Sequence, residues 1–227
     1  MKTISARDLV NFTRKTEKSK QTFALKVKTE VDKSNSGSGG DYWVHSISAI
    51  CNSIKLNDIV PIEEKKEILV NKHYNSAVQR SKVMYERNIR VLDTFADMDF
   101  SSWAPDSGPK FKKIPQKPFV LMFNGVGIKV RPNLLFSFNL NDNTPQIGAI
   151  WFVPNVDGFK KTELGLFVNL LYEYLIQKHG EQYVINSTYC SAIELFNGSA
   201  MNHMDLIDSE TITMLEESVQ ELIKFMK

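Results

Sequence analysis

The chain has few cysteines and no long apolar run. Two cysteines among 227 residues, Cys51 and Cys190, make neither a disulfide framework nor a cysteine metal cluster. We expect both to be reduced, small buried residues. No segment approaches the roughly 20 apolar residues of a membrane span, and the N-terminus has no apolar stretch of signal-peptide length. These absences predict a cytoplasmic protein that does not contact a membrane.

The sequence also has few of the side-chain patterns that carry chemistry. Its four histidines are scattered without metal-ligand spacing, and no Gly-x-Ser-x-Gly motif surrounds a serine. We therefore predict no catalytic residue, no metal and no cofactor. One alternative is an enzyme with an unusual metal site at Asp97 and Asp99. His203 could also bind an ion in a loop before a helix, although a solvated loop is the simpler interpretation.

Charge is distributed unevenly along the chain. Residues 1–132 hold 23 Lys/Arg and 14 Asp/Glu, whereas residues 133–227 hold 5 and 12. Such asymmetry predicts a basic surface that meets an anion. Alternatively, the two halves complement each other within the fold or within a homo-oligomer.

The first half of the chain has mainly helical patterns. Helices are predicted over about 5–15, over 41–56 with Asp41 as the cap, and from Pro61 with breaks to about Phe95. Residues 22–28 alternate as a half-buried strand does, or else continue a helix. The Ser/Gly-rich residues 33–40 predict a flexible loop. We define a basic, mainly helical region over 1–117 and an acidic α/β core domain over 118–227.

The second half alternates strands and helices. Strand patterns at 119–123, 126–132, 134–140 and 146–153 predict an antiparallel meander of three or four strands, with a hairpin turn at Asn124-Gly125 and a turn at 141–143. A helix capped by Thr162 follows over 162–178, then a strand within 182–196 and a helix from Ser209 to Met226 capped by Asp208 or Ser209. The predicted fold class is α+β, a helical N-terminal region followed by a mixed sheet flanked by helices.

Three segments carry a family resemblance: Lys129-Val130-Arg131-Pro132-Asn133-Leu134-Leu135-Phe136, Gly148-Ala149-Ile150-Trp151-Phe152-Val153, and Glu163-Leu164-Gly165-Leu166-Phe167. Their order, with the flanking elements over about 119–195, resembles the core of the restriction-endonuclease-like PD-(D/E)xK nucleases, and within them the RecB-type exonucleases. The resemblance implies a restriction-endonuclease-like fold.

The residues that such nucleases use are replaced here. Asn133 stands in the first acidic slot, and Trp151 and Val153 stand in the acid and lysine slots. Glu163 and Phe167 replace the Gln and Tyr of the helix motif. Because those nucleases need carboxylates to hold Mg²⁺, the resemblance implies a catalytically inactive relative.

Clusters of basic residues indicate phosphate contacts, which supply most sequence-independent affinity for nucleic acid. The residues predicted to bind nucleic acid are Arg14, Lys15, Lys18, Lys20, Lys112, Lys113, Lys129 and Arg131. The leading hypothesis is an inactive nuclease-fold accessory protein that binds nucleic acid, in nucleic-acid processing or anti-phage defence. The rival is a protein–protein interaction module or regulatory subunit that docks on a partner through Glu216, Glu217 and Glu221 of the last helix.

Overall fold

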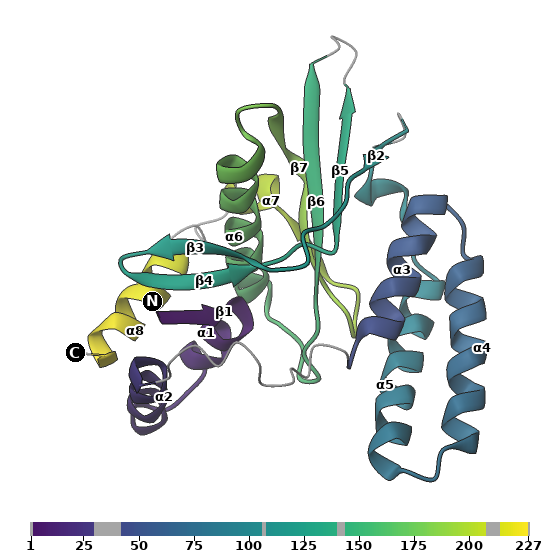
Figure 1. Ribbon diagram of the computed structural model, residues 1–227, viewed down its shortest axis with the longest axis horizontal. Coiled ribbons are helices and arrows are strands. Elements are labelled where there is room, and N and C mark those ends of the chain that lie inside the picture. Colours follow the sequence, from purple (N-terminus) through teal and green to yellow (C-terminus); the bar gives the residue numbers. More distant parts are fainter. Residues whose placement is uncertain (1, 30–41, 106–107, 140–143, 208–213, 227) are drawn as a thin grey trace.

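The chain forms an α+β fold with two mixed sheets and helices around them (Figure 1). The computed structural model describes residues 2–29, 42–105, 108–139, 144–207 and 214–226. Several predictions lie outside these residues: the flexible loop at 33–40, the Asp41 cap, the turn at 141–143, and the caps at Asp208 and Ser209. Among the described residues, no helix combines the length and apolarity that a membrane crossing requires.

The larger sheet has five strands, in the order β2-β5-β6-β7-β8. Strand β5 (Leu134–Asn139) pairs antiparallel with β6 (Pro145–Val153), and β7 (Val184–Glu194) runs parallel to β6. Helix α6 (Lys161–His179) connects β6 to β7, because two parallel strands need a long crossover. The short strands β2 (Lys110–Phe111) and β8 (Ala200–Asn202) form the two edges.

Both faces of this sheet are buried. Along β6, Ile150 and Phe152 belong to the core under the helices of residues 44–96, whereas Ala149 and Val153 belong to the core under α6. All four side chains are at most 2% exposed. Figure 1 shows the consequence, with α3–α5 on one side of the sheet and α6 on the other.

The three helices on one face follow the predicted pattern. They are α3 (Val44–Leu56), α4 (Val60–Asn75) and α5 (Gln79–Ala96), and Pro61 lies in the first turn of α4, where a missing N–H costs nothing. The buried Asn88 of α5 joins the bundle, since its Oδ1 accepts from the Ser46 backbone N–H at 3.1 Å and the Ser46 hydroxyl at 2.8 Å. A short 3₁₀ turn, η2 (Ser101–Trp103), follows α5.

The smaller sheet has the order β1-β4-β3. Strand β1 (Lys2–Ser5) pairs parallel with β4 (Val126–Val130), and β3 (Phe119–Phe123) pairs antiparallel with it. Asn124 and Gly125 have φ of 48° and 86°, as a tight hairpin turn requires, which confirms this predicted turn.

The prediction of one continuous meander over 119–153 is wrong, because β4 and β5 belong to different sheets. Strand β4 already has β1 on one side and β3 on the other, so neither of its edges is open to β5. Pro132, which lacks an N–H for a ladder, marks the place where the chain passes to the larger sheet.

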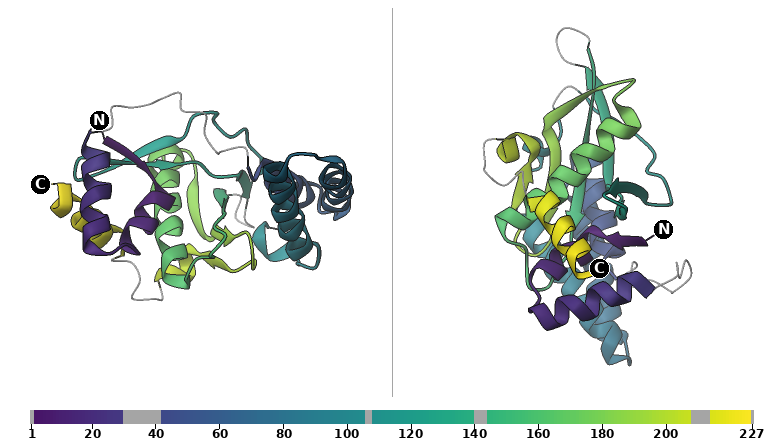
Figure 2. Two further views of the ribbon diagram at one scale, coloured as in Figure 1. Left: turned by 90° about the horizontal axis from the view of Figure 1, so that it is seen from below. Right: turned by 90° about the vertical axis from the view of Figure 1, so that its left-hand side faces the viewer.

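The first 29 residues pack with the C-terminal elements rather than with α3–α5. Helix α1 (Ala6–Thr13) begins as predicted, with the Asp8 backbone N–H donating to the Ser5 hydroxyl at 3.1 Å. Figure 2 shows α8 (Met214–Met226) lying beside α1 and α2 (Glu17–Thr29). Strand β1, which precedes the predicted domain boundary at residue 117, pairs with β4, which follows it. The boundary itself stays a prediction.

Residues 22–28 form part of α2, so the strand prediction is wrong and the helical alternative is right. A strand would have placed Leu25 on the same buried face as Phe23, yet Leu25 is 56% exposed. The buried residues are Ala24 and Val27, three positions apart, which is helical spacing. Phe23 packs on Phe12 with ring centroids 5.6 Å apart.

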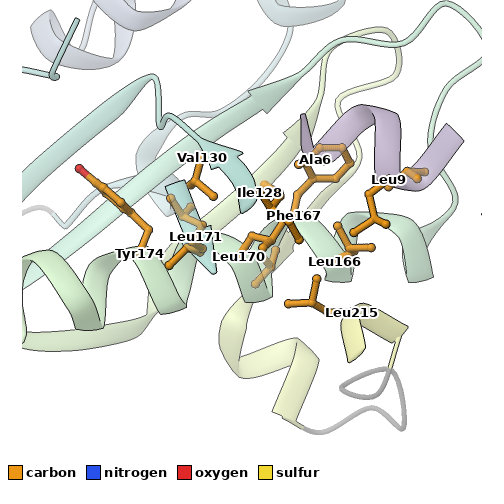
Figure 3. Packing of buried hydrophobic residues seen from close by; sticks show 14 of the residues in the cluster. Ala6, Leu9, Ile128, Val130, Leu166, Phe167, Leu170, Leu171, Tyr174 and Leu215 are labelled. Carbon is orange, nitrogen blue, oxygen red and sulfur yellow. The ribbon is translucent and has the colours of Figure 1, made fainter. Parts of the chain in front are cut away.

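Helix α6 is the centre of the second core. Figure 3 shows its Leu166, Phe167, Leu170 and Leu171 meeting residues of β4, α1 and α8. The helix begins at Lys161, so the predicted cap at Thr162 is wrong. Instead, the Glu163 carboxylate accepts from the Lys160 backbone N–H at 2.7 Å and satisfies a first-turn donor.

Candidate nucleic-acid interface

Asn133, in the first acidic slot of the resemblance, joins the two central strands. Its side-chain oxygen accepts from the Phe152 backbone N–H at 2.8 Å, and its own N–H donates to the Ile150 carbonyl at 2.8 Å. Both bonds fix the start of β5 against β6. The side chain therefore has a structural partner on the strand that would carry the second acidic motif.

Trp151 and Val153, in the acid and lysine slots of the resemblance, belong to the apolar core around α6. The Trp151 and Phe167 rings lie edge to face, with centroids 5.4 Å apart. Val153 is 2% exposed and belongs to the same core. Phe167 contacts the Phe159 ring as well, at 5.0 Å. These positions thus contribute dispersion and apolar burial to the fold.

Glu163, at the start of α6, is nearly buried and forms an ion pair with the partly exposed Arg14. Arg14 Nε lies 2.6 Å from Glu163 Oε1, Nη2 lies 2.5 Å from Oε2, and Nη2 also donates to the Gly158 carbonyl at 2.9 Å. Burial alone would raise the pKa of Glu163, but the hydrogen bonds from Arg14 and Lys160 outweigh it and hold that pKa below its ordinary value. The Arg14 guanidinium, predicted to touch nucleic acid, is thereby engaged within the fold.

The remaining predicted residues near the N-terminus divide into two kinds. Lys15 and Lys18 are exposed on and beside the start of α2, and no carboxylate in the described part of the chain pairs with either. Lys20 differs, because its Nζ lies 2.6 Å from Glu221 Oε1 of α8 and 5.4 Å from the centre of the Phe12 ring.

The four predicted residues between β2 and β5 have different surroundings. The Lys112 ammonium donates to the Tyr183 hydroxyl at 2.8 Å. Lys129 is exposed on β4, between two buried residues, and Arg131 is exposed just after that strand. Lys113 and Arg131 come together at the rim of one pocket.

This pocket, which we call the basic pocket, has a volume of about 310 Å³. It lies between the 113–119 segment, the end of β4, the start of β5 and the last turns of α6. Four cationic side chains line it, and no lining residue within the described chain is acidic; the cations are Lys113, Lys117, Arg131 and Lys178. Residues 107–141 as a whole contain six Lys/Arg and no Asp/Glu. The pocket therefore has a strongly positive potential.

Aromatic rings hold the inner wall of the basic pocket. The Lys178 ammonium lies 4.4 Å from the centre of the Phe119 ring, whose centroid is 5.7 Å from that of Tyr174. Figure 3 shows the Tyr174 hydroxyl at the edge of the core, pointing away from Leu170 and Leu171. Burial raises the pKa of Tyr174, so its hydroxyl keeps its proton at neutral pH. Among the described residues, none shares a hydrogen bond with this hydroxyl.

His179 completes the wall and is neutral at pH 7. Burial lowers its pKa, and the positive charges of Lys112 and Lys178 lower it further. Sequence reasoning did not include Lys178, His179 or Tyr174 in the site. Lys178 and His179 follow the pattern of basic residues that favour the end of a helix dipole, which gives no indication of a pocket.

The other candidates have structural surroundings. Within the described residues, no three His, Cys, Asp or Glu side chains are close enough to hold a metal ion, so Asp97 and Asp99 gain no third ligand there. The prediction of a solvated loop at His203 is wrong, because this residue begins α7 (His203–Ile207) and its ring stacks on Tyr172 at 3.5 Å. Cys51 and Cys190 are free and buried, as predicted.

Comparisons with protein-family models, with curated proteins and with solved structures find no match to this chain.

Proposed function

We propose that this protein binds nucleic acid as a catalytically inactive, restriction-endonuclease-like accessory subunit, in nucleic-acid processing or anti-phage defence. The observation that carries the proposal is the basic pocket with its exposed neighbours. Cations from two sequence-distant regions, residues 113–131 and the end of α6, converge there without an acidic side chain among the lining residues. A polyanion is the ligand that such a surface attracts.

The arrangement of strands supports the kinship with these nucleases. An antiparallel pair, β5–β6, leads through α6 into the parallel strand β7, which is the order that the resemblance requires. The proposal of inactivity is supported by the contents of the three slots. Asn133 bonds to the β6 backbone, while Trp151 and Val153 pack against α6.

The predicted cations differ in how readily they would bind phosphate. Arg14 and Lys20 would have to give up ion pairs with Glu163 and Glu221. The other exposed candidates have no such partner among the described residues; they are Lys15, Lys18, Lys113, Lys129 and Arg131. We therefore assign phosphate binding to these five and to Lys117 and Lys178 of the pocket.

The test is fluorescence anisotropy with labelled single- and double-stranded DNA and RNA, over a series of salt concentrations and with Mg²⁺ present. Affinity should fall with salt, with a logarithmic slope of about −3 if four phosphates of a single strand are neutralised. The strands should stay intact on a gel. A variant with Lys15, Lys18, Lys113 and Arg131 changed to Glu should lose binding.

The matched control reverses charge elsewhere. Lys72→Glu changes an exposed lysine of α4, which belongs to the three-helix bundle on the face of the large sheet opposite α6, and it should leave affinity unchanged. No binding at low salt would refute the proposal. Strand cleavage would refute the inactivity. Salt-dependent self-association without nucleic-acid binding would favour the rival interaction module, for which the exposed Glu216 and Glu217 of α8 offer a docking face.

A further inference from the structure

The basic pocket is concave. Contacts to the phosphates within a nucleic-acid strand need only a flat surface, so the concave shape calls for a separate explanation. The pocket volume of about 310 Å³ is at the lower end for small-molecule sites, close to what one nucleotide needs. A phosphodiester carries a single charge and would meet one or two cations on a flat surface. Four cationic side chains around one recess favour a ligand group that carries more negative charge than one phosphodiester.

A phosphate monoester is such a ligand. It carries a charge of about −1.5 to −2 at neutral pH and offers three strong acceptor oxygens. The donors around the pocket suit these oxygens, because Arg131 offers a planar fork and the lysines offer mobile ammonium groups. The Tyr174 hydroxyl adds a neutral donor that has no hydrogen-bond partner among the described residues.

Apart from His179, the rest of the lining is apolar and suits the flat face of a nucleobase. Phe119, Val130 and Leu135 contribute to the wall, and Pro115, Pro118 and Pro132 stiffen the backbone around it. Phe119 contacts both the Lys178 ammonium and the Tyr174 ring, and these contacts preorganise this wall before any ligand binds. A phosphate group next to a ring with an apolar face describes a terminal nucleotide.

We infer that the basic pocket recognises the phosphorylated end of a nucleic-acid strand, holding the terminal phosphate monoester among Lys113, Lys117, Arg131 and Lys178. This inference rests on the proposed nucleic-acid binding. It adds that the protein distinguishes strand ends from strand interiors. The exposed cations outside the pocket would then contact the following phosphates without distinguishing them.

The experiment compares three labelled oligonucleotides of one sequence: 5′-phosphorylated, 3′-phosphorylated and unphosphorylated. Each phosphorylated strand carries the dye at the end without the phosphate, and the unphosphorylated strand is prepared with the dye at either end as the matched reference. Binding of the full chain is measured by anisotropy at fixed salt. One of the phosphorylated strands should bind at least about tenfold more tightly than the unphosphorylated strand, which corresponds to about 1.4 kcal/mol. Equal affinity for all three strands overturns the inference and leaves the proposed function intact.

Variants locate the preference. Lys178→Gln and Arg131→Gln should each abolish most of the preference while reducing affinity for the unphosphorylated strand only slightly. Lys15→Gln/Lys18→Gln removes exposed charge outside the pocket and should weaken all three strands equally. Lys72→Gln should change none of them. A preference that survives both pocket variants, each with a normal melting temperature, would contradict this assignment.

A competition experiment tests whether the pocket binds the end of a strand or a small phosphate compound. A nucleoside monophosphate should displace the phosphorylated strand, and inorganic phosphate should be less effective because it lacks the nucleoside that would contact the apolar wall. If the monophosphate binds the protein but no oligonucleotide does, then both the strand-end inference and the proposed function are wrong. If no oligonucleotide and no monophosphate binds, the proposed function and the inference fail together.

Discussion

Replacing Arg14 with Met should destabilise the protein without changing its affinity for nucleic acid. The variant leaves the Glu163 carboxylate, whose side chain is 6% exposed, with the Lys160 backbone N–H as its nearest donor. Removing one member of a buried pair typically costs about 3–5 kcal/mol because the other charge stays desolvated. Since the Arg14 side chain is 31% exposed, we expect a loss near the lower limit, about 3 kcal/mol.

Urea unfolding followed by tryptophan fluorescence measures this loss. With a urea dependence of about 3 kcal/mol per molar for a chain of this size, the midpoint should fall by about 1 M. The double variant Arg14→Met/Glu163→Leu should recover much of the stability, because an apolar pair of similar volume avoids the uncompensated charge. A loss below about 0.5 kcal/mol for Arg14→Met would refute the reasoning, as would a large loss of nucleic-acid affinity.

The same ion pair has a pH dependence of known sign. The folded-state pKa of Glu163 is lowered, so the unfolded chain binds the proton first as the pH falls. The stabilisation is therefore complete above the unfolded pKa of about 4.3 and is lost as the pH falls toward the folded pKa. Arg14→Met should flatten this acid limb of the stability curve.

The remaining predictions concern packing and titration. Gly148→Ala should cost about 2 kcal/mol in urea unfolding, because the new Cβ would lie 2.6 Å from the Tyr189 carbonyl oxygen; an unchanged midpoint would argue against this contact. Burial raises the pKa of Cys51 to about 12 and that of Cys190 as well, so a thiol reagent should label two cysteines in urea at pH 8 and neither in the native protein. Burial lowers the pKa of His203, so the unfolded chain takes up this proton first and the protein should lose stability as the pH falls below about 6.5. The His203→Phe variant should therefore lose less stability than the natural chain between pH 7.5 and 5.5, as measured by urea unfolding.

The sequence predicted those elements whose cause is local. Helix α6 repeats apolar residues at helical spacing and ends at Gly180, and the structure places its end there. Asn124-Gly125 predicts its turn because few other residue pairs adopt two positive φ angles at low cost. In both cases the neighbouring residues alone decide the conformation.

Elements that depend on distant partners were predicted less well. The five residues from Phe23 to Val27 fit a strand or a helix about equally, and the choice is made by Phe12 and α8, which pack on one face of α2. The division into two sheets depends on β1, which occupies the edge of β4 from more than 120 residues away. No local signal could have indicated that pairing.

Charges at the candidate site also depend on partners that are distant in the sequence, so the sequence alone does not show which cations are free to bind an anion. A count of charges treats Arg14 and Arg131 alike, yet α6 packs on α1 and supplies Glu163 to the first, while the turn after β4 supplies no carboxylate to the second. Arg14 must leave the nearly buried Glu163 carboxylate before it can bind a phosphate, and the cost of leaving that carboxylate unpaired exceeds what one exposed phosphate contact returns. The two halves of the chain therefore complement each other where helices bring acids to the basic N-terminal residues. Among the described residues, none of the ion pairs involves a cation of the 113–131 segment, and these are among the cations to which we assign phosphate binding.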